Sequence, residues 1–178
     1  MAGIILIIIG IVVAAYFIST YNRLVKLSVK VKEAYAGIEV ALIKRYDVLT
    51  QSLDVAKGYV AHEKELMVQL VRARSGMSVS ETQQVMANQE NAIQRIFAVS
   101  EAYPQLASSE LYKNLQYQIT ETNEHLSAAK RLYHANVSLY NQAIAVFPAN
   151  IIAGMTGKHA EEFLKEENVE AKREVSMK

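Results

Sequence analysis

The N-terminal stretch from Met1 to about Ser75 restricts the possible fold more than any other part of the chain. It begins with an uncharged apolar run, Ala2–Ile18, and continues without a proline into a long three-four pattern of apolar residues. A transmembrane helix needs roughly 20 apolar residues, within a range of about 17–25. The pattern that follows is typical of a coiled-coil seam. We therefore predict one helix that starts in a bilayer and extends to about Ser75, where Gly76 ends it in a left-handed cap.

A cleaved signal peptide is the alternative interpretation of the apolar run. It would carry basic residues before the run and a small-residue cleavage site after it. Met1-Ala2-Gly3 contains no charged side chain, and the helical pattern passes straight through the VVAAYF stretch. We therefore favour a retained anchor over residues 1–20.

Four basic residues follow the apolar run, and no charged side chain precedes it. We call them the basic collar: Arg23, Lys26, Lys30 and Lys32. The positive-inside rule then places the N-terminus outside and the rest of the chain in the cytoplasm. The collar could also contact anionic lipid head groups, at about 1 kcal/mol per residue, or it could only set the topology, and the two roles are compatible.

The apolar pattern beyond the anchor predicts a packing seam along the first helix. Its principal residues are Leu24, Val31, Ile38, Leu42, Leu49, Leu53 and Val60. Helix propensity alone does not hold so long a helix in water, so this seam must be buried against other elements.

Two further helices are expected after Gly76. Ser78-Val79-Ser80-Glu81 is a capping-box pattern that opens the second, and Pro104 stops it. The third begins near Ser108 and Ser109 and ends at Phe147-Pro148. Three long helices with short connections favour an all-α antiparallel bundle over residues 21–157. Residues 158–178 form a charged tail or a short C-terminal helix that reaches about Glu167.

The composition disfavours several function classes. The chain has no cysteine, so disulfides and thiolate chemistry are excluded. Its net charge of +1 gives no general case for nucleic-acid binding. His62-Glu63 lacks the second histidine of a zinc-protease motif, and no glycine-rich phosphate loop is present. We therefore expect no enzyme activity, no resident metal and no cofactor.

Several short motifs occur in a characteristic order. They are Tyr21-Asn22-x-Leu24-Val25, Arg45-Tyr46-Asp47, Gly58-Tyr59-x-x-His62-Glu63, Arg72-x-Arg74, Glu101-Ala102-Tyr103-Pro104, Tyr140-Asn141 and Phe147-Pro148. In this order and spacing the chain resembles the LemA family from about Tyr21 to Gly157. The resemblance implies a bacterial inner-membrane protein with one N-terminal span, a helical domain in the cytoplasm and no established catalytic activity.

The polar motif positions have two interpretations. They are Asp47, His62, Glu63, Arg72, Arg74 and Glu101. These residues either fix helix register through salt bridges and caps, or form a polar contact surface used in assembly.

Three hypotheses about function follow. The first is a membrane-anchored scaffold that self-associates, because the first helix is longer than the second and leaves part of its seam unpaired. The second is a monomeric adaptor that presents a helical surface to another membrane protein. A metal-binding or catalytic bundle is the third, which the missing motifs disfavour. The expected partners are therefore membrane lipid and further copies of the chain, with no nucleic acid.

Overall fold

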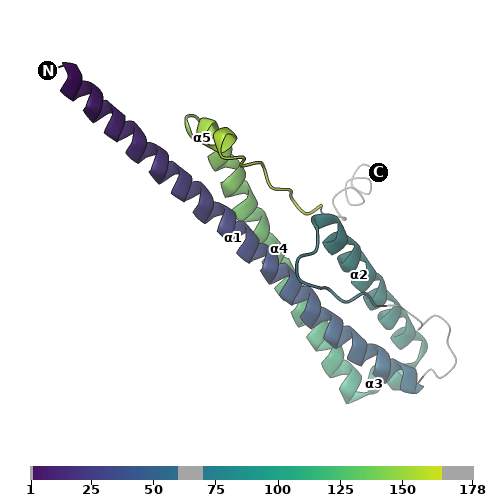
Figure 1. Cartoon of the computed structure of the whole chain (residues 1–178). Coiled ribbons are helices and arrows are strands. Elements are labelled where there is room, and N and C mark those ends of the chain that lie inside the picture. The colour runs from purple at the N-terminus through teal and green to yellow at the C-terminus, as the bar shows by residue number, and fades with distance from the viewer. Residues whose placement is uncertain (1, 60–69, 166–178) are drawn as a thin grey trace, which may run out of the picture. The chain divides into compact units, whose positions relative to one another are not determined.

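The computed structural model describes residues 2–59 and 70–165. Over these residues it contains five helices: α1 (Ala2–Tyr59), α2 (Val79–Ala102), α3 (Pro104–Ser108), α4 (Glu110–Ala145) and α5 (Ala149–Met155). This part of the chain contains no strand (Figure 1). The all-α class is therefore confirmed, with a long N-terminal apolar helix that packs against further long helices.

The chain divides into two compact units, and α1 and α4 contribute residues to both. Unit 1 consists of residues 1–35 and 131–162, and unit 2 of residues 36–130 and 163–178. The core of unit 1 joins α1 to the end of α4 and to α5 through Leu24, Ala143, Ile152 and Ala153, with Phe17, Leu27 and Ile144 packed at its edge.

Unit 2 has a larger core, to which α1, α2, α3 and α4 all contribute. It consists of Val48, Leu49, Leu53, Ala56, Ala92, Ile93, Ile96, Val99, Leu106, Tyr112 and Ile119. The fully buried Tyr112 donates its hydroxyl hydrogen bond to the Ile96 carbonyl at 3.1 Å. A buried tyrosine is usually satisfied in this way, and here the bond ties the start of α4 to α2.

The seam of α1 is packed inside the chain. Its members from Leu24 to Leu53 are each at most 5% exposed, while Val60 lies outside the described residues. These seam residues are therefore buried within the chain, and none of them is left exposed for contact with another chain.

The first helix does not continue to Ser75, which is a correction to the sequence analysis. Residues 70–78 are not helical. Gly76 has the expected left-handed backbone, with φ of 77°, but it lies in a turn of a returning segment instead of capping a helix. Arg72 lies over the Tyr46 ring and Gly76 contacts Glu39, so this segment runs back along α1.

Because of this return, α2 runs parallel to α1 in unit 2 (Figure 1). Glu39 contacts the residues just before α2, whereas Leu42 and Arg45 contact Gln89 and Glu90 within it. The expected antiparallel arrangement with short connections is wrong for this helix pair. The sequence pattern showed where α2 begins, but the return of the chain depends on contacts between residues far apart in sequence.

Local signals at the helix ends were accurate. The Ser78 hydroxyl accepts the Glu81 amide at 3.2 Å, and the Glu81 carboxylate accepts the Ser78 amide at 2.8 Å. This confirms the capping box. Pro104 follows the end of α2 and begins α3, because its missing N–H is not needed in a first helical turn.

The expected C-terminal helix is absent from the described part of the tail. Residues 158–165 are not helical, and residues 166–178 lie outside the described range. The short helix is instead α5, which precedes Gly157. Side chains of α4 bind the main chain of the tail, as described below, and so replace the hydrogen bonds that a helix would supply.

Candidate functional site

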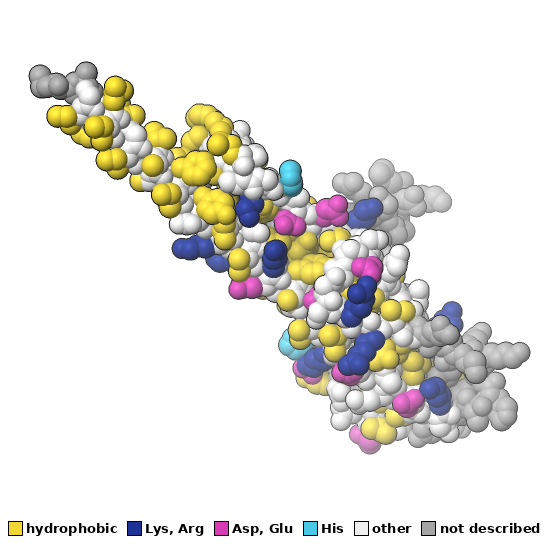
Figure 2. All heavy atoms as spheres, viewed as in Figure 1, with side chains coloured by type: hydrophobic (Ala, Val, Ile, Leu, Met, Phe, Trp, Pro, Cys, Tyr) yellow, Lys and Arg dark blue, Asp and Glu magenta, His cyan; other side chains and the backbone are white. Residues whose placement is uncertain are grey.

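The N-terminal part of α1 is the one helix segment among the described residues that is long and apolar enough to cross a membrane. Residues 3–16 are all exposed, and the isoleucines from Ile4 to Ile9 are between 53% and 65% exposed. Figure 2 shows hydrophobic side chains along this run, with no charged side chain among them. Soluble proteins rarely expose so large an apolar patch. The segment therefore suggests a single-pass membrane anchor.

All four residues of the basic collar are exposed on α1 directly after this run. Arg23, Lys26 and Lys30 are separated by three and four positions, so they share one face of the helix. None of the collar residues forms an ion pair with another described residue. The collar therefore presents positive charge to its surroundings at the end of the apolar run.

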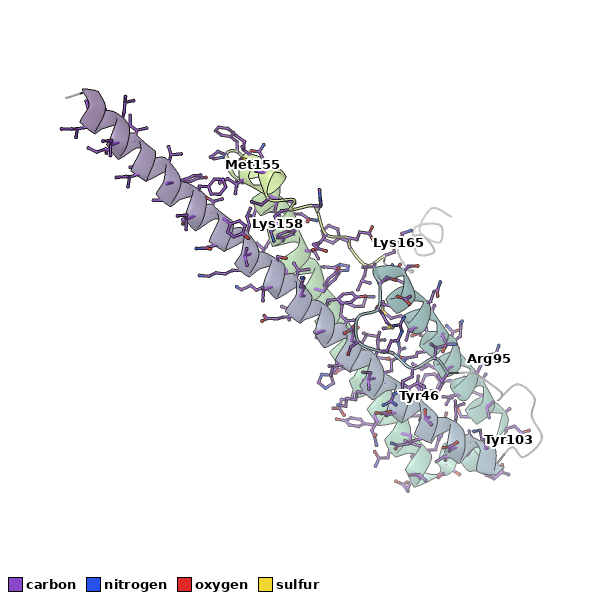
Figure 3. The ribbon with its side chains drawn as sticks, viewed as in Figure 1. Tyr46, Arg95, Tyr103, Met155, Lys158 and Lys165 are labelled. Carbon is purple, nitrogen blue, oxygen red and sulfur yellow. The ribbon has the colours of Figure 1, made fainter. Side chains whose placement is uncertain are left out.

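The structure does not bring the six polar motif positions into one site. Arg72 lies with its guanidinium carbon 5.9 Å from the centre of the Tyr46 ring, which is labelled in Figure 3. Arg74 pairs with Glu81 at 2.6 Å. Asp47 and Glu101 are exposed. His62 and Glu63 lie outside the described residues.

Within residues 2–59 and 70–165, no hydrogen bond or ion pair joins Asp47, Arg72, Arg74 and Glu101 to one another. Over the same residues, no group of three or more His, Asp or Glu side chains is placed to hold a metal ion. Arg72 and Arg74 instead help to fix the returning segment.

Separate buried polar contacts in unit 2 were not predicted from the sequence. The Glu39 carboxylate is 6% exposed and accepts the backbone N–H groups of Gly76 at 2.7 Å and Met77 at 3.2 Å. Further along α1, Arg45 is 3% exposed and pairs with Glu90, while the Gln89 amide donates to the Leu42 carbonyl. Arg45 belongs to the Arg45-Tyr46-Asp47 motif, so the sequence did contain a pattern that could have identified Arg45 as a candidate residue.

A second missed feature is a clamp on the C-terminal tail. The Asn141 amide donates to the Glu161 carbonyl and accepts the Glu161 N–H, both at 2.9 Å. The Tyr133 hydroxyl donates to the Glu162 carbonyl at 2.7 Å. Burial, followed by the charge of Glu161, raises the pKa of Tyr133 to about 12, so this hydroxyl keeps its proton and acts as a donor.

Asn141 uses one amide N–H as a donor and its amide oxygen as an acceptor, so it pairs with both main-chain groups of Glu161 as a neighbouring strand would. The motif Tyr140-Asn141 indicated this position, but the sequence did not identify Glu161 as its partner. The clamp fixes the tail on unit 1 without helical structure.

A sequence model of the LemA family matches residues 34–178. This match covers most of the chain and nearly all of it beyond the anchor. The chain belongs to the LemA family. It is thus a membrane-anchored helical protein of that family, and the order of motifs from Tyr21 to Gly157 identified the family correctly.

The LemA-family chain is also distantly similar to three magnetosome proteins. Magnetosome proteins MamQ 1 and MamQ 2 of Paramagnetospirillum magneticum are each 33% identical to it over 76 residues. MamQ of Magnetospirillum gryphiswaldense is 28% identical over a match of the same length. Each match covers 43% of this chain and 28% of the relative, so the similarity spans less than a third of those proteins.

Proposed function

We propose that this LemA-family protein is a membrane-anchored scaffold that self-associates and organises a bacterial membrane or a complex on it. One observation carries the proposal. In unit 1, α4 presents an outward row in which Leu132 is 59% exposed, Leu139 is 54% exposed, and the small Ala135 lies exposed between them. We call these three residues the α4 row.

The spacing of the α4 row favours a second helix as its partner. Its steps are three and four residues, the a/d spacing of a coiled-coil seam. A small residue between two leucines lets a facing helix approach closely. The seam of α1 cannot serve this purpose, because its described members are buried inside the chain. The sequence suggested that unpaired seam residues of the first helix make the contact between copies. We instead propose the α4 row as this contact.

The anchor supports the same proposal, because tethering copies to one membrane raises the effective concentration of each row for another. The proposed role is structural and requires no catalytic group. The MamQ relatives are named as magnetosome proteins, and a scaffold role for this chain is compatible with that naming.

Replacing Leu132 and Leu139 together by aspartate tests the scaffold. The double variant should lose self-association in mild detergent, because two carboxylates would lose hydration at each contact. Light scattering of the purified full-length protein measures the mass. Tyr117→Asp is the matched control, since Tyr117 is an apolar side chain of α4 that is 71% exposed and lies outside the row.

Wild type and the control should form oligomers of equal mass, and the double variant should be smaller with unchanged helix content. A wild-type protein that is monomeric in both detergent and nanodiscs would refute the scaffold and leave the adaptor hypothesis. Oligomers of unchanged mass in the double variant would show that the α4 row is not the contact.

We also propose that the N-terminus lies outside and the bundle in the cytoplasm, which the basic collar supports through the positive-inside rule. The absence of native cysteine makes this testable with one introduced thiol. Tyr117→Cys should resist a membrane-impermeant maleimide in intact cells and react after lysis. Labelling of this cysteine in intact cells would show that the bundle lies outside, which contradicts the proposed orientation.

A further inference from the structure

The end of unit 1 that α5 forms is amphipathic. Ala149, Ile152 and Ala153 are buried against the rest of unit 1. On the other side, Ile151 is 54% exposed and Met155 is 73% exposed, and Phe147 in the turn before α5 is 79% exposed. Ile151 and Met155 are one helical turn apart, so they lie side by side on one face.

The opposite, buried face of α5 packs beside the end of the anchor. Ile152 and Ala153 belong to the same core cluster as Leu24, with Phe17 at its edge. Ala2–Ile18 is about 25 Å long at ~1.5 Å per residue, whereas the hydrocarbon core of a bilayer is about 30 Å thick. The core of the bilayer would therefore extend a little beyond Ile18, to the level at which α5 packs on α1.

The charge pattern points to the same place. No Asp, Glu, Lys or Arg occurs from Leu132 to Gly157, although such residues make up 21% of the chain. Lys158 is the first charged residue after α5, and Arg23 directly precedes Leu24, which packs with α5. Figure 3 labels Met155 and Lys158 at this end of unit 1, and Figure 2 shows hydrophobic side chains there as well as along the anchor.

We propose that α5 and the turn before it are a second, interfacial membrane contact, in which Phe147, Ile151 and Met155 enter the boundary between lipid head groups and acyl chains. Short amphipathic helices occupy this depth by burying their apolar face about 5–10 Å into the boundary. Lys158 and Arg23 then face the head groups. The inference rests on the proposed use of α1 as a membrane anchor.

The two contacts together would fix unit 1 on the membrane in a way that a single helix does not. A lone anchor leaves its domain free to swivel about the helix axis. An added contact beside the anchor removes this freedom and presents the α4 row at a constant orientation to neighbouring copies. A second copy of the chain is the competing occupant of the apolar face, and the test separates the two.

Single cysteines can report the depth of each position, because the chain has none of its own. Ile151→Cys and Met155→Cys in the full-length protein would be labelled with an environment-sensitive fluorophore and reconstituted in vesicles. Some vesicles would contain lipids with a quencher on the upper acyl chain, for residues 151 and 155, and others lipids with a quencher near the end of the acyl chain, for residue 12 near the middle of the bilayer. Val12→Cys reports the anchor, and Tyr117→Cys is the exposed control outside the proposed contact. Helix content of each labelled variant shows that it is folded.

The probes at residues 151 and 155 should shift to shorter emission wavelength and lose fluorescence with quencher lipids, whereas the probe at residue 117 should do neither. A blue-shifted probe that lipid quenchers do not reach would show that another protein copy covers α5, which overturns the proposal. Quenching at residue 12 without quenching at 151 or 155 would refute the interfacial contact and leave the anchor intact. Absence of quenching at residue 12 would refute the anchor itself.

Discussion

Leu42→Asp is expected to abolish the cooperative unfolding of unit 2. Leu42 is 0% exposed in α1. Truncating such a leucine to alanine costs about 2–5 kcal/mol, and burying an unpaired carboxylate costs several kcal/mol more. Whole domains are stable by only about 5–15 kcal/mol. Thermal melting of the full-length protein in mild detergent, followed by circular dichroism, measures the effect.

Val40→Asp is the matched control for this experiment. Val40 is two residues away on the same helix and is 66% exposed, so the same new charge stays in water. Its melting curve should differ little from wild type, since surface substitutions are usually within about 0.5 kcal/mol. If Leu42→Asp melted like wild type, or if both variants unfolded equally, the assignment of the buried face of α1 would be wrong.

The second large effect is expected for Glu39→Ala. The substitution removes the carboxylate that accepts two backbone N–H groups, those of Gly76 and Met77, in a largely buried position. Hydrogen bonds to charged groups contribute about 1.5–3 kcal/mol, so we expect a loss of about 2–4 kcal/mol. Denaturant unfolding measures the loss, and hydrogen exchange should show faster exchange at these two amides.

Two variants define the specificity of this result. Glu33→Ala changes an exposed glutamate of the same helix and should leave stability and exchange unaltered. Glu39→Gln keeps an acceptor oxygen at the same distance along the side chain, so it should lose less stability than the alanine variant. Unchanged exchange at Gly76 and Met77 in Glu39→Ala would show that the carboxylate does not hold the returning segment.

The candidate site could be predicted from sequence only where a pattern is local. The apolar run and basic collar were readable because membrane spanning depends on composition over a short window. The α4 row also follows a three-four spacing. The buried residues on the opposite face of α4 have the same spacing, so the sequence does not tell which of the two rows is exposed. Exposure depends on which row the other helices cover.

Asn141, Tyr133 and Glu39 show why the remaining features escaped prediction. Each is satisfied by a main-chain group far away in sequence, and a backbone N–H or carbonyl has no residue identity for a pattern to detect. The polar motif positions Arg72 and Arg74 could be recognised, but their predicted place on a helix was wrong, because residues 70–78 are not helical and return along α1.

Local sequence patterns were enough to predict an all-α protein, a first helix that begins with an apolar anchor, and a capping box at Ser78 that opens α2. These features depend on hydrogen bonds and periodicities within a few residues. Tertiary contacts set the parallel direction of α2, the separate buried contacts of Glu39 and Arg45, and the clamp on the tail. Those depend on which distant side chains fill the space beside α1 and α4, and local spacing does not encode that choice.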